Sequence, residues 1–379
     1  MRRLAFVAGL AVALLAGSSA HALRLPSARH CPVFPATNAW NQRVDTLPVA
    51  ADSARLIASI GLDAPVHADF GSGKWDGGPI GIPFDVVCGA LVEAQKRGVA
   101  VRLAYNLDHA KGAPVPPPPI TDPDALEAQP FPTAAIPGVP DLMHHKYVVR
   151  DAASVWTGST NWTGDSWTRE ENVIVMVDSP AVAALYREDF EQLWTTRIVA
   201  GSGKVDTAPV DGMRAWFCPG RGEKLAHRIA KAIGAAQHRV RIASPVISSA
   251  PILGTLAQVA SDGKVDLAGV VDATQIAEVL EQWHENGNAE WKAPLLRTAV
   301  TRAPFSGKLT TPYAPGSVHD YMHAKVTVAD DTVFVGSFNL SHSGELNAEN
   351  VLELTDPKLA ERLAGFVDEV RGRYPPVAV

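Results

Sequence analysis

Short apolar runs rich in β-branched residues alternate with longer amphipathic stretches through most of the chain. The short runs predict strands, because branched side chains suit a pleated backbone, and apolar positions three or four apart predict helices. The predicted strands are 99–105, 147–149, 154–156, 239–243, 265–271, 326–328 and 332–335, and the predicted helices are 88–97, 224–236 and 253–260. Strands that alternate with helices favour an α/β fold.

Residues 23–87 do not follow this pattern. They contain the segment CPVFPATNAWN, a predicted helix at 51–60 and the glycine-rich run FGSGKWDGGPIGIP. A later strand at 240–247 has a helix before it, and no counterpart of this pair is recognisable before Cys88. Three interpretations stay open: the first sheet is incomplete, residues 82–87 supply its missing strand, or 23–87 is a separate module.

Two long loops interrupt the predicted elements. Ten prolines between 114 and 140 restrict that stretch to extended or polyproline conformations and exclude helix. This loop is either an inert surface excursion or a rim over a site. A second loop runs from 291 to 318.

The length of the chain sets the number of domains. With 379 residues, 46% of them hydrophobic, the chain can bury two cores of about 150 residues each. We predict a signal peptide, an N-terminal segment of uncertain fold, a first half, a polar connector with glycines, and a second half. Their bounds are 1–22, 23–87, 88–197, 198–212 and 213–379.

The first residues, MRRLAFVAGLAVALLAGSSAHA, have two arginines, an apolar stretch and a small-residue end. This arrangement is typical of a secretory signal peptide, and the apolar run is short for the alternative, a membrane anchor. We expect export to a bacterial periplasm or beyond. In that oxidising compartment one disulfide can form among Cys31, Cys88 and Cys218. No cysteine or histidine spacing predicts a metal site.

The net charge of −6 becomes more negative when Arg2 and Arg3 leave with the signal peptide. Nonspecific binding to nucleic acid depends mainly on lysines and arginines that neutralise phosphates. The charge therefore favours lipid or small phosphodiester substrates over a generic polyanion. A basic cleft inside an acidic protein is also compatible with this composition.

One signature occurs twice, as MHHKYVVRDAASVWTGSTN and as MHAKVTVADDTVFVGSFN. It has a histidine, a lysine two residues later, an aspartate, and a Gly-Ser-x-Asn step. The first copy contains His144, Lys146, Asp151, Gly158, Ser159 and Asn161, and the second contains His323, Lys325, Asp330, Gly336, Ser337 and Asn339. A glutamate, Glu171 or Glu349, follows ten residues after each motif asparagine. Two such matches exclude coincidence and indicate one active site built from two halves.

The residue types of the signature suit a phosphate site. Residues two apart in an extended strand share a face, so each histidine should lie beside a lysine. Glycine permits close approach of a ligand, and serine and asparagine supply neutral hydrogen bonds. We interpret the glutamate at the same offset in both copies as a partner that orients an imidazole.

The order His-x-Lys, four residues, Asp and then Gly-Ser-x-Asn resembles the signature of the phospholipase D superfamily. The resemblance covers roughly residues 88–375 and includes ALVEAQKRGVAVRLAYN, YREDFEQLW and HRVRIASPVI outside the motifs. It implies two similar α/β/α halves, each a mixed sheet flanked by helices, with one active site at their interface. It also implies a phosphodiesterase that needs neither a metal nor another cofactor.

Two histidines in one site can divide the chemistry. A neutral imidazole can attack phosphorus and form a phosphohistidine, while a protonated imidazole donates to the departing alkoxide and later activates water. The two copies are nearly symmetric and do not decide which histidine does which. The resemblance implies His144 as nucleophile and His323 as general acid and base.

The other signature positions are predicted to support the two histidines. The side chains expected to hold the phosphoryl oxygens are Lys146, Ser159, Asn161, Lys325, Ser337 and Asn339. Glu171 and Glu349 would fix the imidazole tautomers. Gly158 and Gly336 are assigned structural roles, and Asp151 and Asp330 either hold a turn, the role preferred here, or act as catalytic acids. His145 is expected to be structural, and His319 and His342 are expected to be bystanders.

The sequence thus predicts a phosphodiesterase of the phospholipase D type that hydrolyses phospholipids, with transfer of the phosphatidyl group as an extension. The alternatives are an exported endonuclease with the same mechanism and a noncatalytic phosphate- or membrane-binding module. The expected partners are a phospholipid or other phosphodiester and, transiently, a membrane surface, and no protein partner is inferred. Aromatic residues near the motifs either contact substrate or belong to the core: Trp156, Trp162, Trp167, Tyr321 and Phe338.

Overall fold

The computed structural model describes residues 24–25, 28–32, 72–75, 78–109, 123–312 and 317–379. Contacts divide the chain into two compact units, residues 1–68 and 69–379. The first unit contains one described antiparallel pair, β1 (Arg24–Leu25) and β2 (Ala28–Pro32). The predicted signal peptide and the predicted helix at 51–60 lie outside the described residues. All that follows concerns the second unit.

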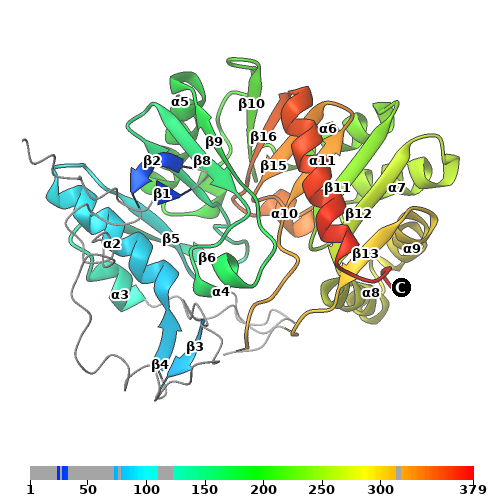
Figure 1. Ribbon diagram of the computed structural model, residues 1–379, viewed down its shortest axis with the longest axis horizontal. Helices are drawn as coiled ribbons and strands as arrows, with labels where there is room; N and C mark the ends of the chain where they lie inside the picture. Colours follow the sequence, from blue (N-terminus) through cyan, green and yellow to red (C-terminus); the bar gives the residue numbers. More distant parts are fainter. Residues whose placement is uncertain (1–23, 26–27, 33–71, 76–77, 110–122, 313–316) are drawn as a thin grey trace, which may run out of the picture. The chain divides into compact units, whose positions relative to one another are not determined.

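A seven-stranded mixed sheet forms the centre of the second half (Figure 1). Its order is β10-β16-β15-β14-β11-β12-β13, with β11, β12 and β13 parallel to one another and the remaining neighbours antiparallel. The strands are β10 (Met213–Phe217), β11 (Arg239–Ser244), β12 (Asp266–Asp272), β13 (Phe305–Lys308), β14 (Val326–Ala329), β15 (Thr332–Gly336) and β16 (Asn350–Thr355). Their buried β-branched residues explain why the sequence pattern located most of them.

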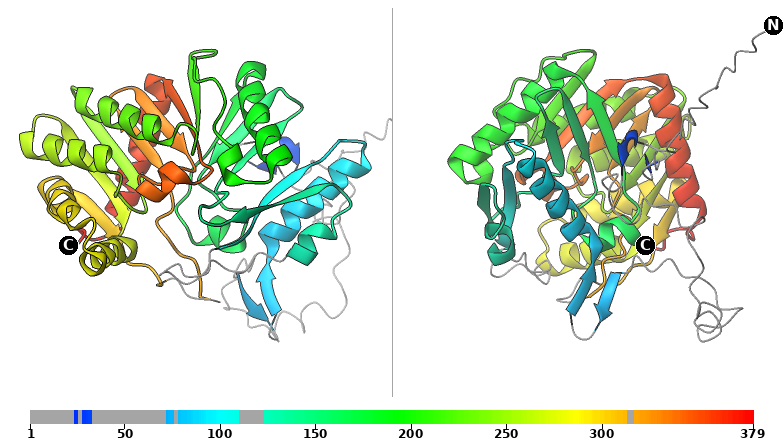
Figure 2. Two further views of the ribbon diagram at one scale, coloured as in Figure 1. Left: turned by 180° about the vertical axis from the view of Figure 1, so that it is seen from behind. Right: turned by 60° about the vertical axis from the view of Figure 1, so that its left-hand side comes forward.

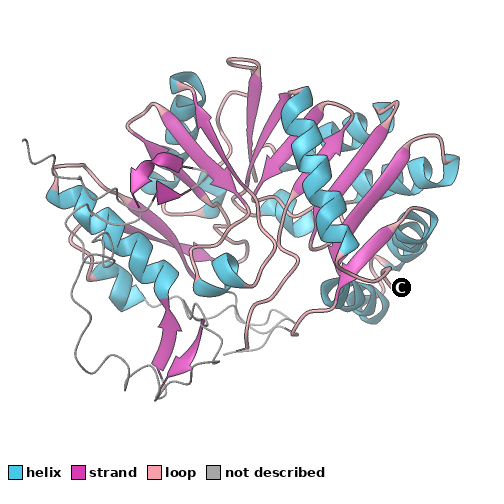
Figure 3. Ribbon diagram, viewed as in Figure 1, coloured by secondary structure: helices cyan, strands magenta, loops and turns pink. Residues whose placement is uncertain are grey.

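Helices cover both faces of this sheet (Figures 2 and 3). One face packs against α11, and the other carries α6, α7 and α9. The helices are α6 (Gly222–Ala235), α7 (Ala250–Asp262), α8 (Ala273–Asn286), α9 (Ala293–Arg302), α10 (His342–Leu346) and α11 (Pro357–Gly372), with a 3₁₀ turn η3 (Glu290–Lys292). The start of α11 is fixed locally, because the Asp356 carboxylate accepts from two backbone N–H groups of its first turn.

The first half repeats part of this architecture. Three antiparallel strands form one sheet, and two parallel strands form another. These strands are β7 (Tyr147–Arg150), β8 (Ser154–Gly158) and β9 (Ile174–Asp178), and β5 (Leu103–His109) and β6 (Thr133–Gly138). The other elements are the hairpin β3 (Ser72–Trp75) and β4 (Gly78–Gly81), the helices α2 (Ile82–Lys96), α3 (Pro123–Glu127), α4 (Gly164–Thr168) and α5 (Pro180–Thr196), and the turn η2 (Val199–Gly201). The predicted α/β fold with two similar halves is therefore confirmed.

The two halves differ at two strand positions, because neither β10, which pairs with β16, nor β11 has a counterpart among the described residues of the first half. β9-β8-β7 corresponds to β16-β15-β14, and β5-β6 corresponds to β12-β13. In the second half β11 joins the two groups, whereas the described residues of the first half have no strand between β7 and β5. The interpretation that 82–87 supplies this strand is wrong, because these residues form the start of α2, with Pro83 in its first turn.

The proline-rich stretch also contains regular structure. Residues 123–127 form helix α3, so the expectation that prolines exclude helix from 114–140 is wrong. Pro123 is the first residue of this helix, a position where the missing backbone N–H costs nothing. Strand β6 follows, and residues 110–122 lie outside the described part.

The two halves share one apolar core. A cluster on the side of α5 and α11 includes Val155 and Tyr186 from the first half and Val328 and Leu363 from the second. A second cluster fills the space between the large sheet and α6, α7 and α9. Within the described residues, no helix has the length and apolar character needed to cross a membrane.

Candidate active site

Each motif histidine lies three residues before a strand, in an extended segment. His144 precedes β7, and His323 precedes β14. The motif lysines turn back toward these segments: Lys146 Nζ donates to the carbonyl oxygen of His144 at 2.7 Å, and Lys325 Nζ to that of His323 at 2.6 Å. Both lysines are buried. The two copies therefore place histidine and lysine in the same local arrangement, as the sequence predicts.

Backbone pairing between the halves fixes both histidines. Met143 forms a parallel bridge with Ala348, and Met322 forms the equivalent bridge with Glu171. The N–H of His144 donates to Ala348 O at 2.9 Å, and the N–H of His323 donates to Glu171 O at 3.1 Å. Each histidine is thus held by the opposite half, so the two motifs form one composite site.

His144 has a carboxylate partner from the second half. Its Nδ1 lies 2.8 Å from Oε1 of Glu349, whose side chain is fully buried. The other oxygen, Oε2, accepts a 2.5 Å hydrogen bond from Ser337. Although burial raises the pKa of Glu349, the neighbouring His144 and Lys146 and these hydrogen bonds bring it below its ordinary value. An ionised Glu349 directs the other nitrogen, Nε2, of His144 away from itself.

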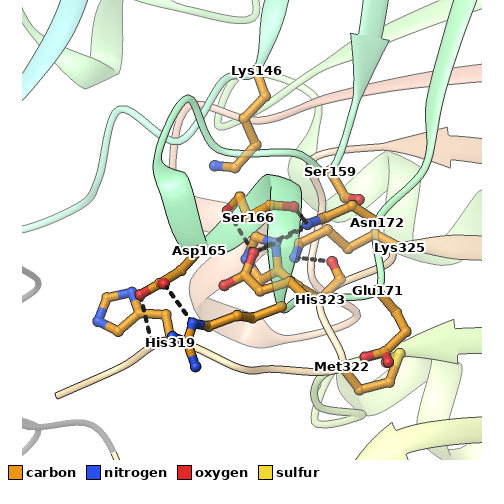
Figure 4. Close-up of polar contacts among 12 residues, drawn as sticks. Lys146, Ser159, Asp165, Ser166, Glu171, Asn172, His319, Met322, His323 and Lys325 are labelled. Carbon is orange, nitrogen blue, oxygen red and sulfur yellow. Dashed lines mark hydrogen bonds and ion pairs between the residues drawn. The ribbon is translucent and has the colours of Figure 1, made fainter. Parts of the chain in front are cut away.

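His323 has a different partner. Its Nδ1 lies 3.0 Å from the amide oxygen of Asn172 (Figure 4). The nearest carboxylate oxygen is Oε2 of Glu170, 3.4 Å from the same nitrogen. Glu170 is held by Ser166 Oγ at 2.5 Å and by Asn172 Nδ2 at 3.1 Å. The two histidines therefore have chemically distinct surroundings.

Glu171 does not take the role predicted for it. Its carboxylate accepts from Lys308 Nζ at 2.8 Å and from the hydroxyl of Tyr374. The physical reason is a difference of one residue between the halves: Gly158 pairs with Ile174, and Gly336 pairs with Val351. Asn172 lies two residues before Ile174, and Glu349 lies two residues before Val351. Asn172, and not Glu171, is therefore the counterpart of Glu349. The equal offset in sequence was misleading because the connecting segment is one residue longer in the first half.

Burial and clustered positive charge keep the histidines neutral. Burial, partly opposed by Glu349, lowers the pKa of His144 to about 4. Burial and the positive charges of Lys325, Lys146 and His144 lower the pKa of His323 well below its ordinary value. Burial lowers the pKa of Lys146 to about 8, and burial and the charge of Lys146 lower the pKa of Lys325 well below its ordinary value. A phosphodiester anion would oppose these shifts, because its negative charge stabilises both imidazolium and ammonium.

The hydroxyls of both motif serines are hydrogen-bonded within the protein. Ser159 Oγ donates to Asn172 Oδ1 at 2.7 Å, as Ser337 Oγ does to Glu349. Each hydroxyl also accepts a backbone N–H at 3.0 Å, from Val173 or Asn350. Both hydroxyls are buried and donate their protons within the protein, so the phosphate contact expected of them stays a prediction. Ser159 orients Asn172, and Ser337 orients Glu349. These two residues in turn orient the imidazoles of His323 and His144.

The motif asparagines remain open to a ligand. Asn161 is half-buried at the end of the first Gly-Ser-x-Asn step. In the second step, the amide oxygen of Asn339 is buried and has no hydrogen-bond partner. An unpartnered polar group costs about 1–3 kcal/mol when it is buried, and such sites occur where a ligand supplies the missing partner. The partner that is missing is a hydrogen-bond donor, which a phosphodiester does not supply, so a phosphate contact of Asn339 would use its Nδ2 group and stays a prediction.

The motif glycines and aspartates shape the backbone. A Cβ atom at Gly158 would lie 2.0 Å from Val173 O, and one at Gly336 would lie 2.1 Å from Asn350 O. Only glycine allows these strands to approach so closely. Asp151 and Asp330 have left-handed backbones, at φ 52° and 51°, in the turns between paired strands. The carboxylate of Asp330 accepts three backbone N–H groups at the start of β11.

Three other histidines, His145, His319 and His342, differ in their surroundings. His145 lies between Asp189 Oδ2 at 3.0 Å and Asn350 Nδ2 at 3.3 Å, and its role is structural as expected. His342 is exposed beside Glu345. His319, expected to be a bystander, is close enough for its charge to lower the pKa of His323.

Sequence reasoning missed Asn172 and Glu170. Aligning the two sequences does not find Asn172, since the shared Glu-Asn-Val run places Glu171 against Glu349 and only the pairing of β9 and β16 in the structure gives the register. No signal in one sequence identifies Glu170, because it lies in the segment whose length differs. Several aromatic and apolar motif neighbours are core residues, among them Met322 and Phe338, whereas Trp167 is exposed. Among the residues that the structure describes, no group of three or more histidines, cysteines and acidic residues is arranged to hold a metal ion.

The fold and the paired histidines and lysines define a class of two-motif phosphodiesterases. A family model described as "Cardiolipin synthase, PLD-like domain" matches residues 81–194 and 229–370, which is more than half of the chain. The chain therefore belongs to this phospholipase D-like family, as the signature predicted.

Curated relatives match shorter stretches. Mitochondrial cardiolipin hydrolase of Xenopus laevis is 38% identical over 52 residues, which are 14% of this chain and 25% of that protein. The Mus musculus protein of the same name is 42% identical over 53 residues, 14% and 24% of the two chains. The Chlamydomonas reinhardtii protein is 25% identical over 119 residues, 30% and 48%. The chain thus spans at most about half the length of these relatives.

The solved structures to which the chain is similar include those of two bacterial proteins. Nuc of Salmonella typhimurium, a phospholipase D family member, is 20% identical, with a TM-score of 0.33 over 43% of this chain and 95% of that one. NucT of Helicobacter pylori is also 20% identical, with a TM-score of 0.30 over 41% and 93%.

Proposed function

We propose that this protein is an exported phosphodiesterase that hydrolyses the headgroup phosphodiester bond of phospholipids through a phosphohistidine intermediate. The observation that carries the lipid assignment is a set of exposed apolar side chains beside both motifs. We call it the apolar rim, and its members are Val139, Trp167, Leu309, Val318 and Leu346. Exposed apolar residues that gather around a site are typical of contact with lipid or another apolar partner.

Hydrogen bonds join the segments of four rim residues, all but Leu309, in two pairs. The Leu142 N–H donates to Asn347 Oδ1 at 2.8 Å, which joins the segment of Val139 to the end of α10. The His319 N–H donates to Asp165 Oδ2 at 2.9 Å, which joins the segment of Val318 to α4. The pairs are related by the symmetry of the two halves. We infer that a membrane surface contacts the rim residues of both pairs.

The site residues support a displacement in two steps. In the first, His144 Nε2 attacks phosphorus, an N–P bond forms, the P–O bond to the headgroup breaks, and protonated His323 gives its proton to the leaving oxygen. In the second, His323 takes a proton from water, the water oxygen attacks phosphorus, and the N–P bond breaks. Lys146, Lys325 and Asn339 stabilise the phosphoryl oxygens as negative charge accumulates. An alcohol in place of water would give phosphatidyl transfer.

Activity on defined substrates tests this proposal. The mature protein should release headgroup from phosphatidylcholine or cardiolipin vesicles in the presence of a chelator, and H144A and H323A should each lower the rate by at least about a thousandfold. Single- and double-stranded DNA are assayed in parallel. Turnover of DNA alone, lost in both variants, would replace the lipid assignment with a nuclease. Binding to vesicles with no turnover of any substrate would favour a noncatalytic module.

The apolar rim provides a separate test of the lipid assignment. Replacing Trp167 and Leu309 with serine should lower the rate on vesicles by about a hundredfold or more, because each apolar side chain that enters the membrane contributes about 1.5–3 kcal/mol. The rate on a short-chain monomeric phospholipid should stay within about twofold. M176S, which changes an exposed methionine of β9, is the matched control. Equal losses on both substrates would show that the rim does not contact the membrane.

A further inference from the structure

The two imidazole partners occupy equivalent positions but differ in charge. Asn172 and Glu349 both precede, by two residues, the residue paired with a motif glycine. Both accept from the motif serine and contact the Nδ1 atom of a motif histidine. The first is a neutral amide, and the second is an ionised carboxylate. His323 thus lacks a charged group at the position where His144 has one.

A carboxylate reaches His323 from a neighbouring position. The segment between Gly158 and β9 is one residue longer than its counterpart, and Glu170 lies in it. Its side chain is only 1% exposed, and its Oε2 lies 3.4 Å from His323 Nδ1. Ser166 Oγ and Asn172 Nδ2 both donate to this same oxygen. Such a buried and doubly bonded carboxylate is held in place by its surroundings and is not a solvated surface group.

We propose that Glu170 is the positioning residue of His323 and supplies the negative charge that Asn172 lacks. This inference rests on the proposed function, in which His323 must be protonated to release the headgroup. Asn172 fixes the tautomer by accepting from Nδ1, and Glu170 favours the protonated ring. The task that Glu349 performs alone for His144 is divided between two residues on the other side.

The positive charges around His323 make a nearby negative charge necessary for protonation of its ring. Lys325, Lys146, His144 and His319 all oppose protonation of the ring. Burial raises the pKa of Glu170, and the hydrogen bonds from Ser166 and Asn172 and the charges of Lys325 and His319 oppose this rise. Removing Glu170 would leave His323 with positive neighbours and a neutral amide. Its protonated form would then persist only at lower pH.

The isosteric variant E170Q tests this role. The kcat on phospholipid vesicles should fall by about ten- to a hundredfold, KM should stay within about twofold, and the basic limb of the kcat profile should move to lower pH by about one unit. The double variant E170Q/N172D, which places the carboxylate directly against His323 Nδ1, should recover at least part of the rate and return the limb toward higher pH. E188Q, which changes an exposed glutamate of α5, should leave kcat and the basic limb of its pH profile unchanged.

Titration of His323 by NMR separates this proposal from the proposed function. The midpoint of its imidazole signal, assigned with H323Q and measured with inorganic phosphate in the site, should be lower in E170Q than in the unaltered protein. This readout does not require turnover. An unmoved midpoint, or a kcat profile with the same basic limb in E170Q, would overturn the role of Glu170. Inactivity of the unaltered protein with a shifted midpoint would overturn only the proposed substrate.

Discussion

Gly336 shows how little space the motif backbone leaves. A methyl group there would lie 2.1 Å from a backbone oxygen that cannot move without breaking the pairing of β15 with β16. G336A should therefore lower the free energy of unfolding by about 2–4 kcal/mol, as other forced overpacking does. Urea denaturation followed by circular dichroism measures this change. G365A, at an exposed position of α11 with no atom near its added methyl, should be neutral or stabilising by up to about 1 kcal/mol.

His144 makes folding depend on pH. Its pKa falls from 6.5 in the unfolded chain to about 4 in the folded protein, so the unfolded state binds more protons between these values. This contribution to stability is complete above pH 6.5 and is lost as the pH falls toward 4, by about 3 kcal/mol in total. Between pH 7.5 and 4.5, the free energy of unfolding measured with urea should fall less for H144Q than for the unaltered protein. H284Q, at an exposed histidine of α8, should show the same loss as the unaltered protein.

Prediction of single residues succeeded for the residue types that both motifs repeat. It failed where the pairing register of the strands decides which side chain reaches the site. The histidines, lysines and Glu349 meet in one site, as the duplicated signature predicts. Glu171 was misassigned because an offset counted along the chain ignores a one-residue difference between the strands. Glu170 could not be predicted, since its function depends on which side chains the longer segment carries toward His323.

At the scale of elements, the motif aspartate connects a turn to a neighbouring strand. Asp330 follows β14, and its carboxylate receives the N–H groups of residues 237–239, which lead into β11. D330A should lower the free energy of unfolding by about 2–4 kcal/mol, because three backbone donors lose a charged acceptor. The rate per folded molecule should stay within about threefold. D331A, at the exposed adjacent position, is the control. A full loss of activity in folded D330A would assign this residue to the chemistry.

Four of the seven described strands and two of the six described helices of the second half were predicted from apolar spacing, because each of these is buried on a regular face. The predicted helix 224–236 corresponds to α6, and the predicted strand 265–271 corresponds to β12. Spacing did not distinguish a helix from a strand at 82–87, where Pro83 and a short apolar run fit either. It also could not foresee α3, because a proline at the first helical position is compatible with both helix and extended chain.

At the scale of the whole unit, the backbone bridges between Met143 and Ala348 and between Met322 and Glu171 couple the two halves. Val155 and Val328 belong to one core, and each motif histidine is bonded to the opposite half. We expect residues 123–379 to unfold in a single transition. In G336A, amide hydrogen exchange should increase in β9 of the first half as much as in β16 of the second. An increase confined to the second half would show that the halves are independent folding units.

The asymmetry between Asn172 and Glu349 has a consequence for how a substrate must lie. Two identical chains related by a twofold axis would offer a phosphodiester the same surroundings in either direction, so either end could become the leaving group. Here a fused pair of halves has one histidine against an ionised carboxylate and the other against an amide. We therefore expect a single direction of binding, with the headgroup always departing on the His323 side and the lipid portion retained on His144.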